Sequence, residues 1–214
     1  MKIKYYYSVA SPFSYLAIDR FINLLDKKKI EVDEKPFDLV GQVFPNTGGI
    51  PVPKRHPSRL KYRITEIERI GLKYGIDINT QPKHFPPKDP HLAAKFTIAA
   101  IQLGNKLTFG RECLKCLWSE EKDISDINVI EQICKNLNVD FKKVKEMADS
   151  DEIKTIYNNN SNDAIKEDVF GAPTYIYKEK HQHQPLKIED LECIITVSGF
   201  LLFLLSLVKS GPLL

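Results

Sequence analysis

The sequence predicts an α/β fold in which a block of helices interrupts the strands. Three observations predict it. A short alternating segment at the N-terminus is followed at once by helical spacing, a long middle stretch has helical spacing throughout, and strand character returns near residue 173. A chain of 214 residues is long enough for one domain, or for one domain with an insertion.

The N-terminal third is predicted to be strand, helix, strand. The first strand is expected over Lys2–Ser8, where alternate apolar residues share one face: Ile3, Tyr5 and Tyr7. Helical spacing from Tyr15 to Leu25 then predicts a helix that ends near Lys29. A second strand is expected over Ile30–Val40, with Pro36 marking an edge or a bulge.

The middle of the chain is predicted to be helical. After a Gly- and Pro-rich loop (46–57), a helix over Pro57–Tyr74 is expected to stop at Gly75, with an inward face formed by Leu60, Ile64, Ile67 and Leu72. The pair Asp89-Pro90 is expected to begin the next helix, closed by Gly104. Further helices are expected around Phe109–Leu117, after a cap at Asp126, from Phe141 and from Asp151, before a strand at Pro173–Tyr177.

Charge and cysteine usage exclude some classes of function. The net charge is +3, with acids and bases mixed along the chain, so a dedicated nucleic-acid partner is not expected. No secretory signal is visible before the first strand. The four cysteines lack the spacing of a disulfide framework and are predicted to be reduced thiols, which favours a cytoplasmic location.

Ser11 lies on the predicted turn from the first strand into the first helix. A helix N-terminus offers unpaired N–H groups and a partial positive charge, so it can hold an anion, and a thiolate is an anion. Serine before proline is also a common choice for a turn or a helix cap, and on this motif alone the structural interpretation is favoured.

The string Ser11-Pro12-Phe13-Ser14-Tyr15-Leu16-Ala17 resembles the 2-hydroxychromene-2-carboxylate isomerases and their relatives, the kappa-class glutathione transferases, within the DsbA-like thioredoxin superfamily. Ser11 and Ser14 stand where the superfamily has its redox cysteines, so this chain cannot cycle a disulfide there. The resemblance implies a thioredoxin-like domain (1–45 and 166–214) split by a large all-helical insertion (46–165). It also implies that Ser11 faces the sulfur of glutathione.

A second segment strengthens the resemblance. In Asp168-Val169-Phe170-Gly171-Ala172-Pro173-Thr174-Tyr175, the family likeness makes Pro173 a cis-proline. It also makes Ala172 the residue whose backbone N–H and C=O pair with glutathione, an extended peptide.

A third segment implies further glutathione contacts. After the proline-rich loop, the family has a basic residue, an aromatic, an acid and an arginine. Here Arg59, Tyr62, Glu66 and Arg69 stand at these places, with arginine for the usual lysine and glutamate for the usual aspartate. Tyr62, Glu66 and Arg69 share one helix face, which also fits a solvated salt-bridge stripe. Asn46 is the nearest candidate for a family asparagine.

Other motifs are predicted to be structural. Cys113 and Cys116 have redox or zinc spacing, but they follow a helical stretch without a second ligand pair, so buried helix-face residues are expected. Trp118 is expected to pack in the core. His181 and His183 lie in a polar run without a third ligand nearby, and no metal site is predicted.

The resemblance ends near residue 178. The family's Asp-Arg turn, which binds the glutamyl end of glutathione, does not appear, and residues Ile194–Val208 are almost wholly apolar. This segment falls short of the roughly 20 residues that span a bilayer, so membrane association is not expected. Three interpretations stay open: an unusually apolar core helix, a membrane-associated tail, or a C-terminus foreign to the family after a frame shift.

Taken together, the motifs predict a glutathione-dependent cis–trans isomerase of the 2-hydroxychromene-2-carboxylate isomerase type, acting on a small conjugated aromatic acid. Glutathione is the expected cofactor, and a homodimer is expected from the family. The alternatives are a kappa-like glutathione transferase or peroxidase, and a non-catalytic thioredoxin-like protein or DsbA-type relative that lacks the Cys-x-x-Cys motif.

Overall fold

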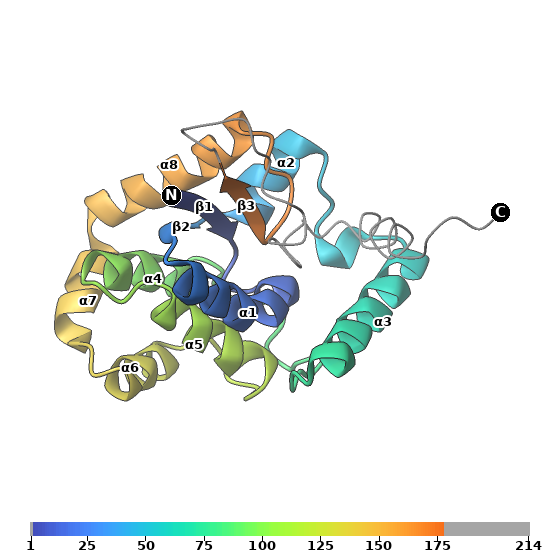
Figure 1. The fold of residues 1–214 in the computed structure, drawn as a ribbon, viewed down its shortest axis with the longest axis horizontal. Helices are drawn as coiled ribbons and strands as arrows, with labels where there is room; N and C mark the ends of the chain where they lie inside the picture. The colour runs from blue at the N-terminus through green and yellow to red at the C-terminus, as the bar shows by residue number, and fades with distance from the viewer. Residues whose placement is uncertain (1, 178–214) are drawn as a thin grey trace.

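The computed structural model describes residues 2–177. Their sheet has three strands, β1 (Lys2–Tyr7), β2 (Glu31–Pro36) and β3 (Thr174–Tyr177), in the order β2-β1-β3 (Figure 1). β1 pairs parallel with β2 and antiparallel with β3, so Tyr5 lies opposite both Glu34 and Tyr175. The parallel pair is joined by a helix, as the right-handed βαβ connection requires.

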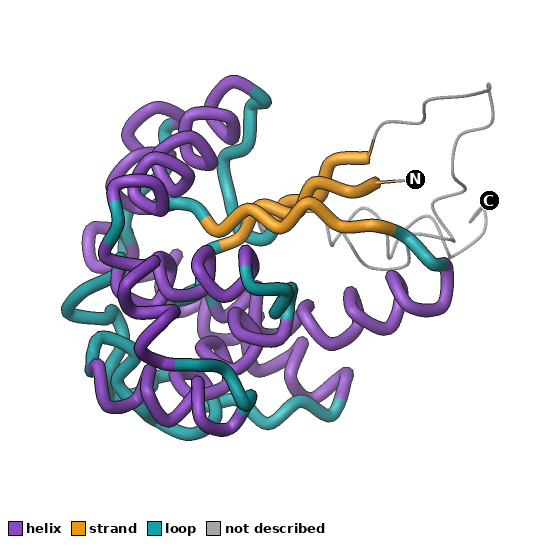
Figure 2. The backbone as a smooth tube through the Cα atoms, turned by 90° about the vertical axis from the view of Figure 1, so that its left-hand side faces the viewer, coloured by secondary structure: helices purple, strands orange, loops and turns teal. Residues whose placement is uncertain are grey.

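Helices make up most of the remaining described chain, and Figure 2 shows them on both sides of the sheet. The α-helices are α1 (Pro12–Lys28), α2 (Phe44–Thr47), α3 (Pro57–Tyr74), α4 (Leu92–Gln102), α5 (Thr108–Trp118), α6 (Ile127–Asn136), α7 (Phe141–Asp149) and α8 (Asp151–Lys166). A short π-helix covers Leu39–Val43 and a 3-10 turn covers Val52–Lys54. The predicted fold class, an α/β thioredoxin-like domain with a large helical block, is confirmed.

β1 is buried on both faces. Tyr5, Tyr6 and Tyr7 are each 0% exposed. On one face Tyr5 stacks on Tyr7 with ring centroids 4.5 Å apart, and it also contacts Phe21 of α1. On the other face Tyr6 packs in a smaller cluster with Phe37 and with Ala164 of α8. The alternation predicted for Ile3, Tyr5 and Tyr7 is therefore present, but the opposite face is covered as well.

Two predicted boundaries were wrong for local reasons. β2 ends at Pro36 instead of Val40, because Asp38 caps a π-helix by accepting a hydrogen bond from the Gly41 N–H at 2.8 Å. α4 begins at Leu92, two residues after Pro90, although Asp89 still accepts hydrogen bonds from the N–H groups of His91 and Leu92. The predicted cap at Asp126 is confirmed: its carboxylate accepts a hydrogen bond from the Asn128 N–H.

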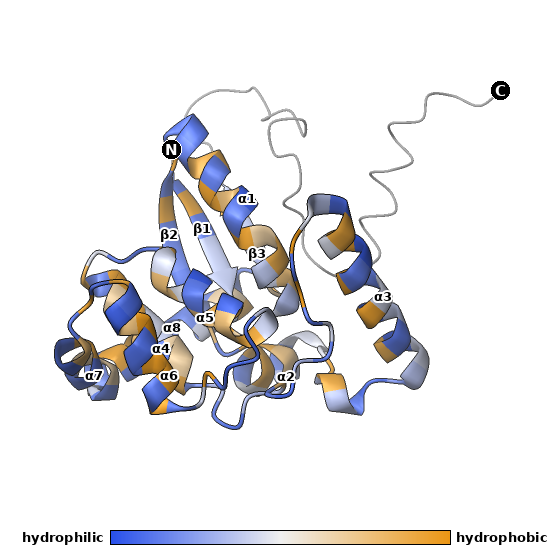
Figure 3. Cartoon of the chain, turned by 90° about the horizontal axis from the view of Figure 1, so that it is seen from below, coloured by the Kyte–Doolittle hydropathy of each residue, from blue (hydrophilic) through white to orange (hydrophobic). Residues whose placement is uncertain are grey.

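α3 has the predicted bounds, but its buried face was predicted wrongly at one end. Leu72 is 85% exposed, whereas Ile67 and Ile70 pack against Leu16 of α1. Five residues separate Ile67 from Leu72, which turns the side chain about 140° away around the helix. α3 therefore contacts α1 along a narrow stripe, and it stands at one side of the molecule in Figure 3.

Several predictions fall on the residues outside the described range: the histidines His181 and His183, the absent Asp-Arg turn and the apolar segment Ile194–Val208. The division of the chain at residues 46 and 165 stays a prediction. Within residues 2–177, the helices are all too short or too polar to cross a bilayer.

Gly110 permits the close approach of α5 to β1. A Cβ atom at this position would lie 2.0 Å from the hydroxyl oxygen of Tyr7 and 2.9 Å from the ring carbon that carries it. We expect Gly110→Ala to lower the free energy of unfolding by about 1–3 kcal/mol through overpacking, although alanine is the better helix former. Urea unfolding measures the loss. Exposed Glu131→Ala in α6 is the control, and a Gly110→Ala variant as stable as that control would contradict the packing described here.

Candidate functional site

Ser11 is the N-cap of α1. Its backbone is extended (φ −83°, ψ 125°), and Pro12 occupies the first helical position. The Ser11 hydroxyl oxygen accepts a hydrogen bond from the Ser14 N–H at 3.3 Å. The hydroxyl donates to the carbonyl oxygen of Ala172 at 3.2 Å. The first helix and the segment before β3 are therefore joined at Ser11, and both Ser11 and Ala172 are buried.

Two backbone donors remain open beside this hydroxyl. Within residues 2–177, the N–H groups of Phe13 and Ala172 have no hydrogen-bond acceptor. Phe13 is in the first turn of α1, where N–H groups point out of the helix and the helix dipole is positive. Ala172 is 5% exposed. The arrangement therefore offers two peptide N–H groups to an acceptor that this part of the chain does not provide, beside a hydroxyl that is bonded to the Ala172 carbonyl oxygen.

The Ala172–Pro173 peptide bond is cis, as predicted. The Ala172 carbonyl differs from the prediction in one respect, because one of its lone pairs already accepts the Ser11 hydroxyl. The second lone pair and the N–H group are left for an extended ligand.

Three of the four residues predicted on α3 lie together: Tyr62, Glu66 and Arg69. Arg69 donates to both carboxylate oxygens of Glu66, at 3.1 and 2.7 Å. Tyr62 hydrogen-bonds to the same carboxylate, and its pKa is raised, first by partial burial and then by the charge of Glu66. Glu66 is buried under this pair. Its carboxylate is thus held by its own helix neighbours, which agrees with the alternative of a salt-bridge stripe more closely than with an open ligand-binding carboxylate.

Asn46 is held locally: its side-chain amide donates to the carbonyl oxygen of Gln42 at 2.7 Å, and the residue is exposed. In the described part of the chain, neither Asn46 nor any of the α3 residues is hydrogen-bonded to Ser11 or Ala172.

Arg59 belongs to an arginine cluster that the sequence analysis did not predict. Arg55 lies just before α3, and Arg59 and Arg63 follow at four-residue intervals within the first two turns of the helix, whose first turn contains no acid. Arg63 is 9% exposed and lies over the rings of Phe85 and Trp118, at 5.1 and 5.8 Å. Its pKa is lowered to about 10, first by burial and then by Arg55. Three cations at the positive end of a helix oppose one another and the helix dipole, so this surface favours an anion.

The three cysteines within residues 2–177 have no redox character in this structure. Cys113, Cys116 and Cys134 are free and buried, as predicted for the first two. Burial raises the pKa of the Cys116 thiol to about 12 and that of Cys134 to about 11, and the pKa of Cys113 is raised further. A thiol with a raised pKa is a poor nucleophile. The described residues contain no group of three side chains that could hold a metal ion.

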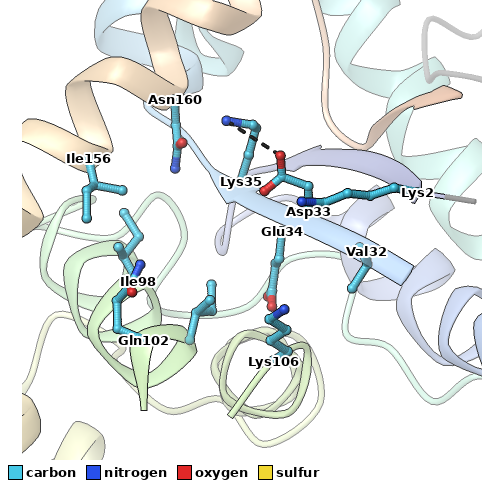
Figure 4. Close-up of a pocket in the computed structure, with 11 residues that line it drawn as sticks. Lys2, Val32, Asp33, Glu34, Lys35, Ile98, Gln102, Lys106, Ile156 and Asn160 are labelled. Carbon is cyan, nitrogen blue, oxygen red and sulfur yellow. Dashed lines mark ion pairs between the residues drawn. The ribbon is translucent and has the colours of Figure 1, made fainter. Parts of the chain in front are cut away.

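A second polar site lies at the edge strand β2, toward the opposite end of the sheet from Ser11. It is a pocket of about 370 Å³ between β2, α4 and α8 (Figure 4). Glu34 points into it; the carboxylate accepts hydrogen bonds from the Tyr7 hydroxyl and from the Leu107 N–H, each at 2.6 Å. Burial raises the pKa of Glu34 to about 7, although these donors and Lys106 act in the opposite direction. The sequence contained one indication that Glu34 is buried, because it stands at an inward-facing position of the alternating pattern in β2.

Comparison with known proteins agrees with this architecture. The family model of the DsbA-like thioredoxin domain matches residues 2–192, and the chain therefore belongs to that family. Glutathione S-transferase kappa 2 of Caenorhabditis elegans is 25% identical over 179 residues, which cover 80% of this chain and 78% of the transferase. The uncharacterized protein YwbO of Bacillus subtilis is 22% identical over 179 residues, covering 81% of this chain and 85% of YwbO.

Solved structures show the same fold. The structure of 2-hydroxychromene-2-carboxylate isomerase superposes with a TM-score of 0.69 at 19% identity, covering 83% of this chain and 86% of the isomerase. The cytosolic disulfide reductase DsbM of Pseudomonas aeruginosa superposes with a TM-score of 0.66 at 14% identity, covering 98% and 99% of the two chains. A second structure of DsbM contains GSH.

The two serines of the first helix differ in their surroundings, which predicts different effects of their removal. Ser11→Ala removes the N-cap and the bond to Ala172, so we expect a loss of about 1 kcal/mol in the free energy of unfolding. The Ser14 hydroxyl is buried without a partner among residues 2–177. Ser14→Ala is therefore expected to be neutral or stabilising. Denaturant unfolding of both variants tests this, and equal losses would contradict the asymmetry.

Glu34 makes stability depend on pH. The pKa of Glu34 is about 7 in the folded chain, whereas the ordinary value of a glutamate is 4.5. Between these two values the folded state keeps a proton that the unfolded state has lost. Its contribution is fully present below about pH 4.5 and is lost as pH rises through 7, by on the order of 3 kcal/mol. We expect Glu34→Gln to raise the melting temperature relative to the parent more at pH 8 than at pH 5. Parallel melting curves across this range would show that Glu34 does not titrate as described.

Proposed function

We propose that this chain binds glutathione between the N-terminus of α1 and Ala172 and is a glutathione-dependent isomerase of conjugated acids. The observation that carries the proposal is the position of the Ser11 hydroxyl, bonded to the Ala172 carbonyl oxygen, beside the open N–H groups of Phe13 and Ala172. The two N–H groups have no acceptor among residues 2–177, and the hydroxyl can turn from its carbonyl acceptor to a charged one, so a thiolate joined to a peptide matches all three donors.

The residues present fit the cofactor. The open N–H and the second lone pair of Ala172 suit strand-like pairing with a peptide. The arginine cluster at the start of α3 suits the carboxylates of glutathione, and Arg59 is its exposed member. Glu66 is given no contact with glutathione in this proposal, because Arg69 and Tyr62 already hydrogen-bond to its carboxylate oxygens.

When bound, glutathione supplies a thiolate that adds reversibly to a conjugated double bond of the substrate and turns it into a single bond. Rotation occurs about that single bond, and the double bond re-forms when the thiolate departs. Ser11 has the positioning and electrostatic role: its hydroxyl turns from Ala172 and donates to the sulfur. The N–H of Phe13 and the dipole of α1 favour the charged sulfur over the neutral thiol, which lowers its pKa from about 8.5. No proton has to be moved by the chain between addition and departure.

A kappa-like glutathione transferase is the second candidate, favoured by the 25% identity with glutathione S-transferase kappa 2. It would use the same thiolate but release a stable conjugate. Product analysis separates the two: an isomerase returns free glutathione after each turnover, whereas a transferase consumes one glutathione for each product.

The role of Ser11 predicts a change in the pKa of bound glutathione. We expect Ser11→Gly to raise that pKa by about 1–2 units, equivalent to the loss of one hydrogen bond to a charged group, because glycine still serves as an N-cap. The measurement is the thiolate absorbance of the complex as a function of pH. Ser14→Ala is the matched control, since its hydroxyl lies in the same helix turn and is expected to leave the titration unchanged.

Turnover should follow the same order. With a conjugated cis acid as substrate, Ser11→Gly is expected to lose roughly 10–100-fold in kcat/KM, and Ser14→Ala less than about twofold. Full activity of Ser11→Gly, or glutathione affinity absent from the folded parent chain, would refute the proposed function.

A further inference from the structure

The outer side of β2 presents a short row of unpaired peptide groups. The N–H of Phe37 donates to the carbonyl oxygen of Tyr7, so this residue faces β1. Because backbone groups alternate along a strand, Asp33 and Lys35 also face β1, while Val32, Glu34 and Pro36 face outward. The carbonyl of Pro36 accepts the Asn160 amide at 2.9 Å, which agrees with this alternation. For Val32 and Glu34, no outward strand partner is present in the described chain.

This row borders the pocket of about 370 Å³ described above (Figure 4). The inner part of the pocket is apolar or buried, with Ile98 of α4 and Ile156 of α8. The outer rim is polar and exposed: Lys2, Gln102 and Lys106. The pocket therefore combines a strand edge, an apolar wall and a cationic rim.

The charges of the pocket are not balanced among the described residues. Lys35 is paired with Asp163 of α8 at 3.4 Å and lies 4.0 Å from Asp33. Lys2 and Lys106 have no carboxylate within ion-pair distance in residues 2–177, although Lys106 interacts with Glu34 at longer range. The titratable groups around Glu34 are Tyr5 and Tyr7 on β1, Lys106 before α5, and the Asp33–Lys35–Asp163 group.

We propose that this pocket is a second ligand site, separate from the Ser11 site, that binds a short extended peptide ending in a free carboxylate. The peptide adds to the edge of β2 through Val32 and Glu34, places its last side chain against Ile98 and Ile156, and directs its carboxylate to Lys106 and Lys2. Backbone pairing gives such a site its affinity, and the end group gives it specificity.

Glu34 makes the site sensitive to pH. When Glu34 is ionised, it repels the ligand carboxylate and competes for Lys106; when it is protonated, both effects disappear. Affinity should therefore be higher at about pH 6 than at about pH 8, on either side of the titration of Glu34.

The test uses the full chain and two probes, acetyl-alanyl-leucine with a free carboxylate and the same peptide as its C-terminal amide. Calorimetry measures affinity, and backbone NMR shifts locate the site. We expect the acid to bind at least about tenfold more tightly than the amide, with shifts at Val32, Glu34 and Lys106. Lys106→Gln should remove most of that preference, and Glu34→Gln should abolish the pH dependence.

Two further variants sharpen the test. Val32→Pro removes an outward N–H without touching the ladder to β1, a position where an edge strand tolerates proline, and should weaken both probes. Ser11→Gly should change neither. The proposal is overturned by absence of binding, by equal affinity for acid and amide, by an unchanged preference in Lys106→Gln, or by shifts confined to the turn around Ser11.

Discussion

The burial of β1 on both faces is the constraint from which the other elements take their places. Three consecutive tyrosines without exposed surface need apolar partners above and below the sheet. α1 and α5 provide them for Tyr5 and Tyr7, and α8 provides them for Tyr6. The helical segment inserted between β2 and β3 thus completes the core of the sheet, since α5 and α8 both belong to it. Removing that segment would open the face of β1 that holds Tyr6 and would leave α1 alone to cover Tyr5 and Tyr7.

The candidate site is a consequence of the same packing. β1 ends at Tyr7, the chain turns, and α1 begins at Pro12 with its positive end beside the segment that leads into β3. Because β3 is antiparallel to β1, the residues before β3 come to the end of β1 where α1 starts. Ala172 therefore reaches Ser11, although 161 positions separate them in sequence. The two open N–H groups follow from helix geometry and from chain direction, and neither depends on a flexible side chain.

This explains which features could be predicted from the sequence. The turn at Ser11, the bounds of α3 and the caps of several helices are set by local patterns, and they were predicted from them. The cis bond at Pro173 was predicted from the family resemblance. Glu34 was missed because its meaning depends on Tyr7 and Leu107, which no local pattern brings together. Of the arginine cluster, the sequence indicated only Arg59 as a functional residue. The unfavourable burial of the Arg63 charge can be recognised only in the structure. Leu72 was misplaced because α3 contacts its neighbour along a narrower stripe than helical spacing suggests.

The two serines show how the site differs from a disulfide-exchanging one. A pair of cysteines works in sequence, the first exposed to attack and the second available to resolve the mixed disulfide. Here the second position, Ser14, is fully buried and its hydroxyl has no described partner, whereas Ser11 is at the edge of the site with two hydrogen bonds. The N-terminus of α1 has open hydrogen-bond donors of the kind that suit an anion, while Ser11 and Ser14 provide no sulfur. Under the proposed function, chemistry at this place depends on a thiol brought in from solution, and the open peptide groups of Ala172 favour one that is carried by a peptide.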